Sequence, residues 1–377
     1  MSKLKISAHD RILIFAPHPD DESLAAGGLI QRAVRAGAKV RAVLVTDGDN
    51  NPWPQRFVER RLKIRRTDRA RWGRRRRKEA LAALAHLGLD PATSVRFMGW
   101  PDQGVTNFLL AANENALFAL WAEIMEWKPT LIVTPSGADT HPDHNAFFVL
   151  AQIAAARLEK PPRVLRYLIH APKHHSEKRR ATLHLSDEEI ETKRAAILCH
   201  ESQMALSRKR FVGYAGEQEV FFESEPVRED HRHPISSAWI ERGGLRLEIK
   251  LLRRRRASFS SEAVLMAFEC ATEGSVRWIL QMPTTSQRAE IIDAKTGEPT
   301  RFAAVRIRGK RAEVSVPISA LQPLRHVFVK LQRKFFLYDE AGWRAVPLSD
   351  AAATASSDAD ETAAGTQTKI AERTVAL

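Results

Sequence analysis

The sequence predicts a parallel α/β sandwich in its N-terminal part, followed by a smaller all-β domain. Over the first 223 residues short apolar runs alternate with helical segments, which is the pattern of a parallel sheet covered by helices. From residue 236 strand-like runs follow one another directly, broken by Gly, Pro, Ser and Thr, which is typical of a sandwich or barrel. A chain of 377 residues with 44% hydrophobic residues is long enough for two cores.

The elements of the N-terminal part are expected in regular alternation. Apolar strands are predicted at residues 11–16, 39–46, 94–98, 131–135 and 163–169. Helices are predicted at residues 22–36, 77–87, 113–127, 145–158 and 187–200. Gly37 and Gly88 mark the ends of the first two helices, and Ser186 with Glu189 forms a capping-box pattern before the last one.

Composition sets the domain boundaries. Residues 1–223 form the α/β domain, and the polar, Pro-containing segment 224–235 is expected to be a linker. Residues 236–348 form the β-rich domain, in which Arg308-Gly309-Lys310 is expected to be a hairpin turn. Residues 349–377 are rich in Ala, Ser, Thr and Asp with few large apolar side chains, so we expect a disordered tail.

Several protein classes are disfavoured by composition. The two cysteines, Cys199 and Cys270, lie far apart and indicate neither a disulfide framework nor a Cys-based zinc site. The sequence has no run of about 18 uncharged apolar residues, so no transmembrane helix is expected. We expect a cytoplasmic protein, with peripheral attachment to a membrane left open. The formal charge of +14 favours an anionic partner.

Two related motifs follow two of the predicted strands directly. His18-Pro19-Asp20-Asp21-Glu22 comes after residues 11–16, and His141-Pro142-Asp143-His144 comes after residues 131–135. Each motif opens a predicted helix. Ligands of a parallel α/β sheet bind outside the carboxyl ends of its strands, so both motifs are expected at the same edge of the sheet.

The residue types in these motifs indicate a hydrolytic metal site. Zinc in such sites takes three nitrogen or oxygen ligands and keeps one position open, and His18, Asp21 and His144 would supply them. Asp20 is then a spare carboxylate that can accept a proton from the attacking water. His141, as a cation, could stabilise a developing oxyanion, with Asp143 orienting its ring. Another divalent metal would suit the same ligands.

These motifs resemble the PIG-L/LmbE-like family of metal-dependent de-N-acetylases, over roughly residues 10–222. Weaker similarities are Thr46-Asp47-Gly48, Arg76-x-x-Glu79, Gly99-x-Pro-Asp102 and the segment 193–203. The resemblance implies a Rossmann-like parallel sheet with helices on both faces and the same metal ligands. It also implies Asp20 as general base, His141 as oxyanion stabiliser partnered by Asp143, and Arg76 and Asp102 as substrate-binding residues.

The resulting functional hypothesis is a zinc-dependent deacetylase of the N-acetylglucosaminyl type. Its substrate would be an N-acetylated amino sugar or a conjugate of one, lipid-linked or phosphate-linked forms included, and no nucleic acid is expected. Two alternatives stay open: hydrolysis of another amide, and a non-catalytic protein that binds an anionic surface or glycan through its basic segment and β domain. The completeness of both His-Pro-Asp motifs favours the enzyme.

The basic segment between residues 56 and 78 contains thirteen Lys or Arg residues among twenty-three. It fits a solvated surface and, equally, a patch for phosphate groups or an anionic membrane surface. If the segment is helical, Arg61, Arg65 and Arg69 share one face. Of the nearby tryptophans Trp53, Trp72 and Trp100, at least two are expected to pack in the interior, and His200 is expected in the core or beside the site.

Overall fold

The computed structural model describes residues 2–171, 180–223, 226–251, 262–271, 274–335 and 338–348. The predicted disordered tail, 349–377, lies outside these residues. The chain divides into two compact units, Met1–Leu109 with Asn113–Glu225 and Leu110–Ala112 with Pro226–Leu377. The division falls within the segment predicted as a linker, and the independent folding of the two parts stays a prediction.

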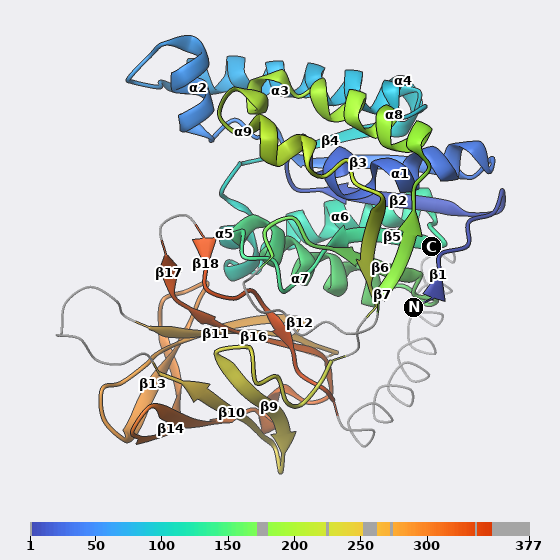
Figure 1. Cartoon of the computed structure of the whole chain (residues 1–377). Helices are drawn as coiled ribbons and strands as arrows, with labels where there is room; N and C mark the ends of the chain where they lie inside the picture. The colour runs from blue at the N-terminus through green and yellow to red at the C-terminus, as the bar shows by residue number, and fades with distance from the viewer. Residues whose placement is uncertain are drawn as a thin grey trace, which may run out of the picture. The chain divides into compact units, whose positions relative to one another are not determined.

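The first unit is built on an eight-stranded sheet in the order β1-β7-β8-β6-β5-β2-β3-β4 (Figure 1). The strands are β1 (Ser2–Lys3), β7 (Arg180–His184), β8 (Gln218–Phe222), β6 (Arg163–Tyr167), β5 (Leu131–Pro135), β2 (Arg11–Ala16), β3 (Lys39–Thr46) and β4 (Val95–Trp100). The run from β6 to β4 is parallel, which confirms the predicted α/β class. The sheet as a whole is mixed, because β8 pairs antiparallel with both β6 and β7.

Helices cover both faces of this sheet, as predicted. On one face α1 (Asp21–Arg35) and α3 (Arg66–His86) pack against α8 (Asp187–Leu198), which contacts α9 (Glu201–Val212). On the other face α6 (Glu114–Trp127) packs against α7 (Pro142–Ala156). The short helices are α2 (Pro52–Glu59), α4 (Pro91–Ser94) and α5 (Val105–Leu110). Within the described ranges, no helix combines the length and the apolar character needed to cross a membrane.

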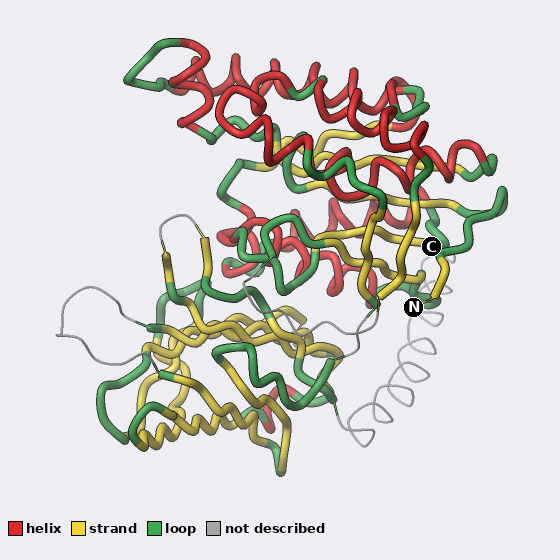
Figure 2. The backbone as a smooth tube through the Cα atoms, viewed as in Figure 1, coloured by secondary structure: helices red, strands yellow, loops and turns green. Residues whose placement is uncertain are grey.

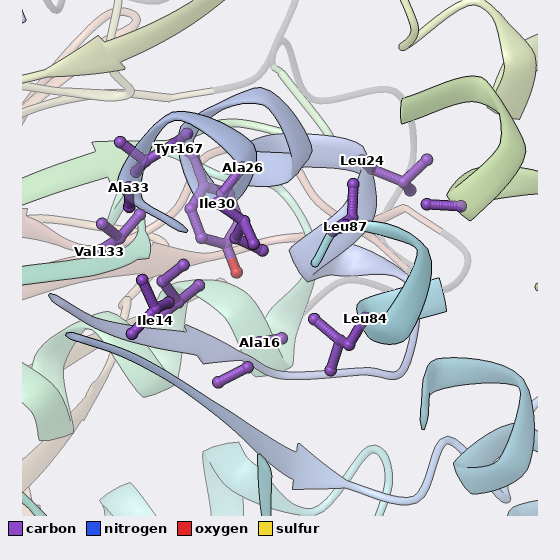
Figure 3. Close-up of a cluster of buried hydrophobic side chains, with 14 of the residues drawn as sticks. Ile14, Ala16, Leu24, Ala26, Ile30, Ala33, Leu84, Leu87, Val133 and Tyr167 are labelled. Atoms are coloured by element: carbon purple, nitrogen blue, oxygen red, sulfur yellow. The ribbon is translucent and has the colours of Figure 1, made fainter. Parts of the chain in front are cut away.

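The central strands hold the core of this unit because both of their faces are covered. Ile14 of β2 and Val133 of β5 lie with Ile30 of α1 and Leu84 of α3 in one buried cluster (Figure 3). None of these four side chains is exposed to solvent. A strand buried on both faces reads as a continuous apolar run, which is why these strands were visible in the sequence.

Helix α3 begins at Arg66, well before the predicted start at residue 77. Asp68 stabilises the earlier start: its carboxylate accepts a hydrogen bond from the Arg65 backbone N–H at 3.0 Å and forms ion pairs with Arg61 and Arg71. The first part of α3 is rich in exposed arginines, so it lacks the apolar periodicity from which the helix was predicted. Because Arg61 and Arg65 precede the helix, the expected row of Arg61, Arg65 and Arg69 on one helical face does not form.

The second unit contains a nine-stranded antiparallel sheet in the order β19-β16-β11-β12-β13-β14-β15-β10-β9 (Figure 2), confirming the predicted all-β architecture. The strands are β9 (Ile235–Glu241), β10 (Gly244–Lys250), β11 (Ala263–Cys270), β12 (Gly274–Gln281), β13 (Gln287–Asp293), β14 (Pro299–Arg308), β15 (Arg311–Pro317), β16 (Leu324–Gln332) and β19 (Arg344–Ala345), with β17 (Lys334–Phe335) and β18 (Tyr338–Asp339) forming a separate hairpin. Gly309 and Lys310 form the predicted hairpin turn, since Arg308 pairs with Arg311.

This sheet curls into a half-barrel. Arg344, on the edge strand β19, donates hydrogen bonds to the carbonyl oxygens of Val227, Arg228 and Ile235, and the last of these begins the opposite edge strand β9. The two edges are thereby tied together around a core of alternating inward-facing side chains.

Helix α8 starts with the predicted capping box, which is confirmed and extended by two arginines. Ser186 and Glu189 exchange the two side-chain to backbone hydrogen bonds. The same Glu189 carboxylate forms ion pairs with Arg32 at 2.5 Å and Arg35 at 2.9 Å, both on α1. The hydrogen bonds from Arg32, against the opposing effect of burial, lower the pKa of Glu189 to about 2.

We predict that Glu189→Gln weakens the docking of α8 on α1 at neutral pH. A lowered folded-state pKa stabilises the fold above the unfolded pKa of about 4.3 and loses that contribution as the pH falls through about 2. Arg35 is half-exposed, so we expect a loss of only about 1–2 kcal/mol at pH 7. Hydrogen exchange of α8 amides should show this loss at pH 7 and a shrinking difference from wild type below about pH 4.

In Asp187→Asn, the matched control at an exposed position of the same helix turn, exchange should stay near wild type. An unchanged exchange rate of Glu189→Gln at pH 7 would contradict the assigned role.

Candidate metal centre

The two His-Pro-Asp motifs meet because the strands before them are neighbours. β2 pairs parallel with β5, with Ile12, Leu13 and Ile14 opposite Leu131, Ile132 and Val133. The chain runs outward from β2 through β3 to β4 and then returns to β5 on the other side of β2. This reversal is the topological switch point, where open α/β sheets form their binding crevices. The first motif enters α1 and the second enters α7 at this edge.

Three side-chain atoms converge between the motifs. Asp21 Oδ2 lies 3.4 Å from His18 Nδ1 and 3.1 Å from His144 Nε2, and the two ring nitrogens are 3.1 Å apart. Tetrahedral zinc with bonds of about 2.0–2.2 Å has ligand atoms roughly 3.3–3.6 Å apart. One separation lies within this range and two lie about 0.2 Å below it, so a small outward shift of the side chains would let the predicted ligands hold a single divalent ion. Two further groups with ligand atoms within 4.8 Å of one another are His18–His141–His144 and His18–Asp102–Asp143.

The second nitrogen of each converging histidine contacts carboxylates. His18 Nε2 lies 3.2 Å from Asp102 Oδ1 and 3.3 Å from Asp143 Oδ2. His144 Nδ1 lies 3.2 Å from Asp139 Oδ2. A carboxylate on one ring nitrogen keeps the proton there, so that the lone pair of the other nitrogen faces the shared point. This is the usual arrangement around metal-binding histidines.

Asp139 is the functional residue that the sequence reasoning missed. It is fully buried and accepts hydrogen bonds from the backbone N–H groups of His141 at 2.8 Å and of Ile169 and His170 at 3.1 Å. These bonds fix the carboxylate against His144. Its position just before the second motif was a signal that it belongs to the site. The residues between β5 and that motif include several polar ones, however, and spacing alone does not single out Asp139.

The electrostatics of this cluster favour a bound cation. Burial alone would lower histidine pKa values, yet Asp21 and Asp139 raise the pKa of His144 to about 10. The pKa of His18 is also raised, through Asp102, Asp143 and Asp21. Although burial opposes it, the pKa of Asp21 falls well below its usual range because of His144 and His18. Excess carboxylates thus stabilise positive charge where the three donor atoms meet.

Asp20, the predicted general base, occupies a strained backbone position at the start of α1. Its φ is 137°, and its N–H donates to Glu22 Oε2 at 3.0 Å. Its carboxylate lies 2.9 Å from Arg76 Nη2. Burial raises the pKa of Asp20 to about 6, although Arg76 opposes the rise. A carboxyl group with a pKa near neutrality is suited to exchanging protons.

Arg76 is buried and held by the chain itself. Its guanidinium donates to the carbonyl oxygens of Gly48 at 2.9 Å and Pro19 at 2.6 Å, besides contacting Asp20. Gly48 has a φ of 61°, and a Cβ there would lie 1.8 Å from Arg76 Nη1, so only glycine fits. Through these contacts Arg76 positions the carboxylate of Asp20. A contact of Arg76 with substrate stays a prediction.

Asp102, also predicted to bind substrate, is similarly occupied. One carboxylate oxygen faces His18, and the other accepts from the Asn50 backbone N–H at 2.8 Å. The side chain is only 4% exposed. The geometry favours a role in orienting His18, and substrate contact by Asp102 stays a prediction.

His141 lies beside the three donor atoms, with its ring centre 4.6 Å from that of His18. Its Nδ1 accepts a hydrogen bond from the Asp143 backbone N–H at 3.2 Å, which leaves the proton of a neutral ring on Nε2. Burial, together with positive charge on His18 and His144, lowers the pKa of His141 well below 6.5. The carboxylate of Asp143 accepts from the backbone of Gln103 at 2.7 Å and faces His18.

His200 is fully buried, in agreement with the expectation that it supports the site. Its Nε2 lies 3.2 Å from Glu22 Oε1 and from Ser23 Oγ. Glu22 in turn accepts from the Asp20 N–H. Trp72 and Trp100 are buried, as expected for two of the three tryptophans, whereas Trp53 is exposed.

The fold is an α/β unit, and its donor set, at the switch point of the sheet, is one that could hold a divalent metal. Residues 13–155 match the model of the PIG-L family, described as GlcNAc-PI de-N-acetylase. The resemblance predicted from the two motifs is thereby confirmed over these residues.

Relatives with an assigned activity match about a third of the chain. A 1D-myo-inositol 2-acetamido-2-deoxy-alpha-D-glucopyranoside deacetylase from Mycobacteroides abscessus is 35% identical over 150 residues, which is 36% of this chain and 51% of the relative. Its counterpart from Mycobacterium avium is 36% identical over 146 residues, covering 36% and 47%. The chain thus spans about half the length of these relatives. The conserved protein TT1542 from Thermus thermophilus aligns with a TM-score of 0.42 and 26% identity, over 58% of this chain and 96% of that one.

We predict that His144→Ala loses the metal, whereas Asp139→Asn retains it weakly. Removing a ligand destroys the donor set, but removing its carboxylate partner only loosens the ring, which typically costs about 10- to 100-fold in metal affinity. Competitive chelator titration of the metal-loaded protein measures both effects. The exposed control Asp187→Asn should bind like wild type, and full retention of metal by His144→Ala would refute the ligand assignment.

Proposed function

We propose that the N-terminal unit is a zinc-dependent hydrolase that removes the N-acetyl group from an amino-sugar conjugate. The observation that carries this proposal is the convergence of His18 Nδ1, Asp21 Oδ2 and His144 Nε2 beside the buried carboxylate of Asp20. The match to the PIG-L model and the deacetylase relatives supports the same chemistry.

His18, Asp21 and His144 would hold the zinc ion. Two imidazoles and one carboxylate are a donor set that zinc accepts in hydrolytic enzymes, and the donor spacing suits it. When bound, zinc polarises a carbonyl group and makes a water molecule more acidic. The carboxylates behind His18 and His144 keep both rings oriented for binding.

Asp20 would act as the proton carrier. Its carboxylate takes a proton from water as the water oxygen forms a bond to the acetyl carbon. It then gives that proton to the nitrogen as the carbon–nitrogen bond breaks, so the products are acetate and a free amine. Arg76 holds the carboxylate in place through its 2.9 Å contact.

His141 would stabilise the negative charge that develops on the carbonyl oxygen. Because its Nδ1 accepts from the Asp143 N–H, a neutral ring presents Nε2–H as a donor. Burial lowers the pKa of His141 and favours this neutral donor over the cation expected from the sequence. Asp143 orients the site through His18 and through its backbone N–H.

The substrate class follows from the named relatives, which deacetylate a glucosamine joined to inositol. We therefore place the substrate among conjugates in which an N-acetylated amino sugar is joined to a polar or phosphorylated group. A screen for acetate release from inositol-, lipid-, nucleotide- and phosphate-linked N-acetylglucosamine, with and without zinc, tests this. Absence of acetate release from every conjugate by zinc-loaded protein would overturn the proposal.

We predict that Asp20→Asn keeps the metal and loses most of its activity. The amide has nearly the same shape and can still accept from Arg76, but it cannot take up a proton. Loss of a general base typically lowers kcat by about two to four orders of magnitude. Steady-state rates on the best substrate of the screen, normalised to bound zinc, measure the effect. Near-normal turnover by metal-loaded Asp20→Asn would remove Asp20 from the mechanism.

A further inference from the structure

An apolar surface is exposed on helix α2 and the turn that follows it. Trp53 is 60% exposed, Phe57 61% and Leu62 92%. Trp53 and Phe57 are four residues apart on α2, so they lie on the same face of the helix. The other side of α2 is packed, since Pro54 and Gln55 are buried. Exposed aromatic and aliphatic side chains grouped in one segment mark a site of interaction.

Exposed basic side chains are interspersed in sequence with this apolar surface and follow it. Arg60, Lys63, Arg65 and Arg66 are exposed, and they form no ion pair with any described part of the chain. Other arginines of the segment are neutralised internally, as in the pairs Arg61–Asp68 and Arg71–Glu59. Uncompensated charges therefore lie within four residues of Phe57 or Leu62 in the sequence.

The segment is fixed to the rim of the metal centre. The Asn50 backbone N–H donates to Asp102, which contacts His18. Asn51 Nδ2 donates to Gln203 Oε1 of α9 at 3.3 Å, and Gln55 Nε2 donates to the Asp68 carbonyl oxygen at 2.8 Å. The start and the middle of α2 are thus held by hydrogen bonds, and the apolar side chains project from this base.

We propose that this α2 docking surface, made of Trp53, Phe57, Leu62, Arg60, Lys63, Arg65 and Arg66, binds an anionic lipid bilayer. Insertion of the three apolar side chains removes their exposed area from water, and aromatic rings favour the interfacial layer. The surrounding guanidinium and ammonium groups then meet lipid phosphates. A nucleic acid backbone would neutralise the charges but leave Leu62 exposed to water.

The experiment is co-sedimentation of the full-length protein with vesicles of phosphatidylcholine alone or with about 30% phosphatidylglycerol. Wild type should bind the anionic vesicles more tightly, and added salt should weaken this binding. The variant R60Q/K63Q/R65Q should lose about fivefold in partitioning for each cation removed. The variant W53S/F57S/L62S should lose at least about tenfold, and its residual binding should be fully salt-sensitive.

Matched controls separate these effects from general changes in charge or hydrophobicity. K5Q/K39Q/K128Q removes three exposed cations elsewhere on the same unit, and Phe118→Ser removes a 63% exposed apolar side chain from α6. Both should partition like wild type. Equal binding to neutral and anionic vesicles, or equal losses in the control and docking variants, would overturn the proposal, as would tighter binding of single-stranded RNA than of anionic vesicles.

This inference does not depend on the proposed activity, because partitioning is measured without turnover. The docking variants should also keep bound metal and any activity on a water-soluble substrate, since their side chains are exposed. A failed acetate screen together with salt-sensitive vesicle binding would remove only the proposed function. Activity without vesicle binding would remove only the docking surface.

Discussion

The parallel pairing of β2 with β5 is the constraint on which the metal centre depends. Both strands are buried on both faces, so a shift in register would exchange the side chains packed on the two faces and disrupt the core. The pairing brings the two carboxyl ends to one edge, and the turns that follow aim His18 and His144 at the same point. The ligands are therefore positioned by the most rigid part of the unit, as a site with ligand atoms 3.1–3.4 Å apart requires.

Collecting this many buried charges is costly unless each is compensated. Backbone N–H groups provide most of this compensation: three donate to Asp139, two to Asp143 and one to Asp102. Such donors stabilise ionised carboxylates, which in turn orient the histidines. Asp20 is the exception, since its carboxylate depends on Arg76 and its pKa is raised to about 6. The pKa values of Asp139 and Asp102 are thus lowered, whereas that of Asp20 is left near neutrality.

The local parts of this arrangement could be predicted from the sequence. Strand-end motifs predicted that His18, Asp21 and His144 converge, because parallel neighbours share an edge. The carboxylates that contact these histidines come from distant segments of the chain. Asp102 reaches His18 from the end of another strand, and no periodicity in the sequence predicts this contact. The antiparallel β8 was missed for the same reason, since Gln218–Phe222 is too short for its direction to be inferred. The arginines at the start of α3 masked a helix that Asp68 caps.

The position of α2 connects the chemistry of the site to its surroundings. The segment between β3 and α3 is anchored near its start by the contact of Asn50 with Asp102 and continues into α3, whose Arg76 holds Asp20. These anchors belong to the same shell that orients the metal ligands. Trp53 and Phe57 are therefore carried at a fixed place relative to the metal donors, within one compact unit. A bilayer bound there would therefore also fix the orientation of the metal donors relative to its surface.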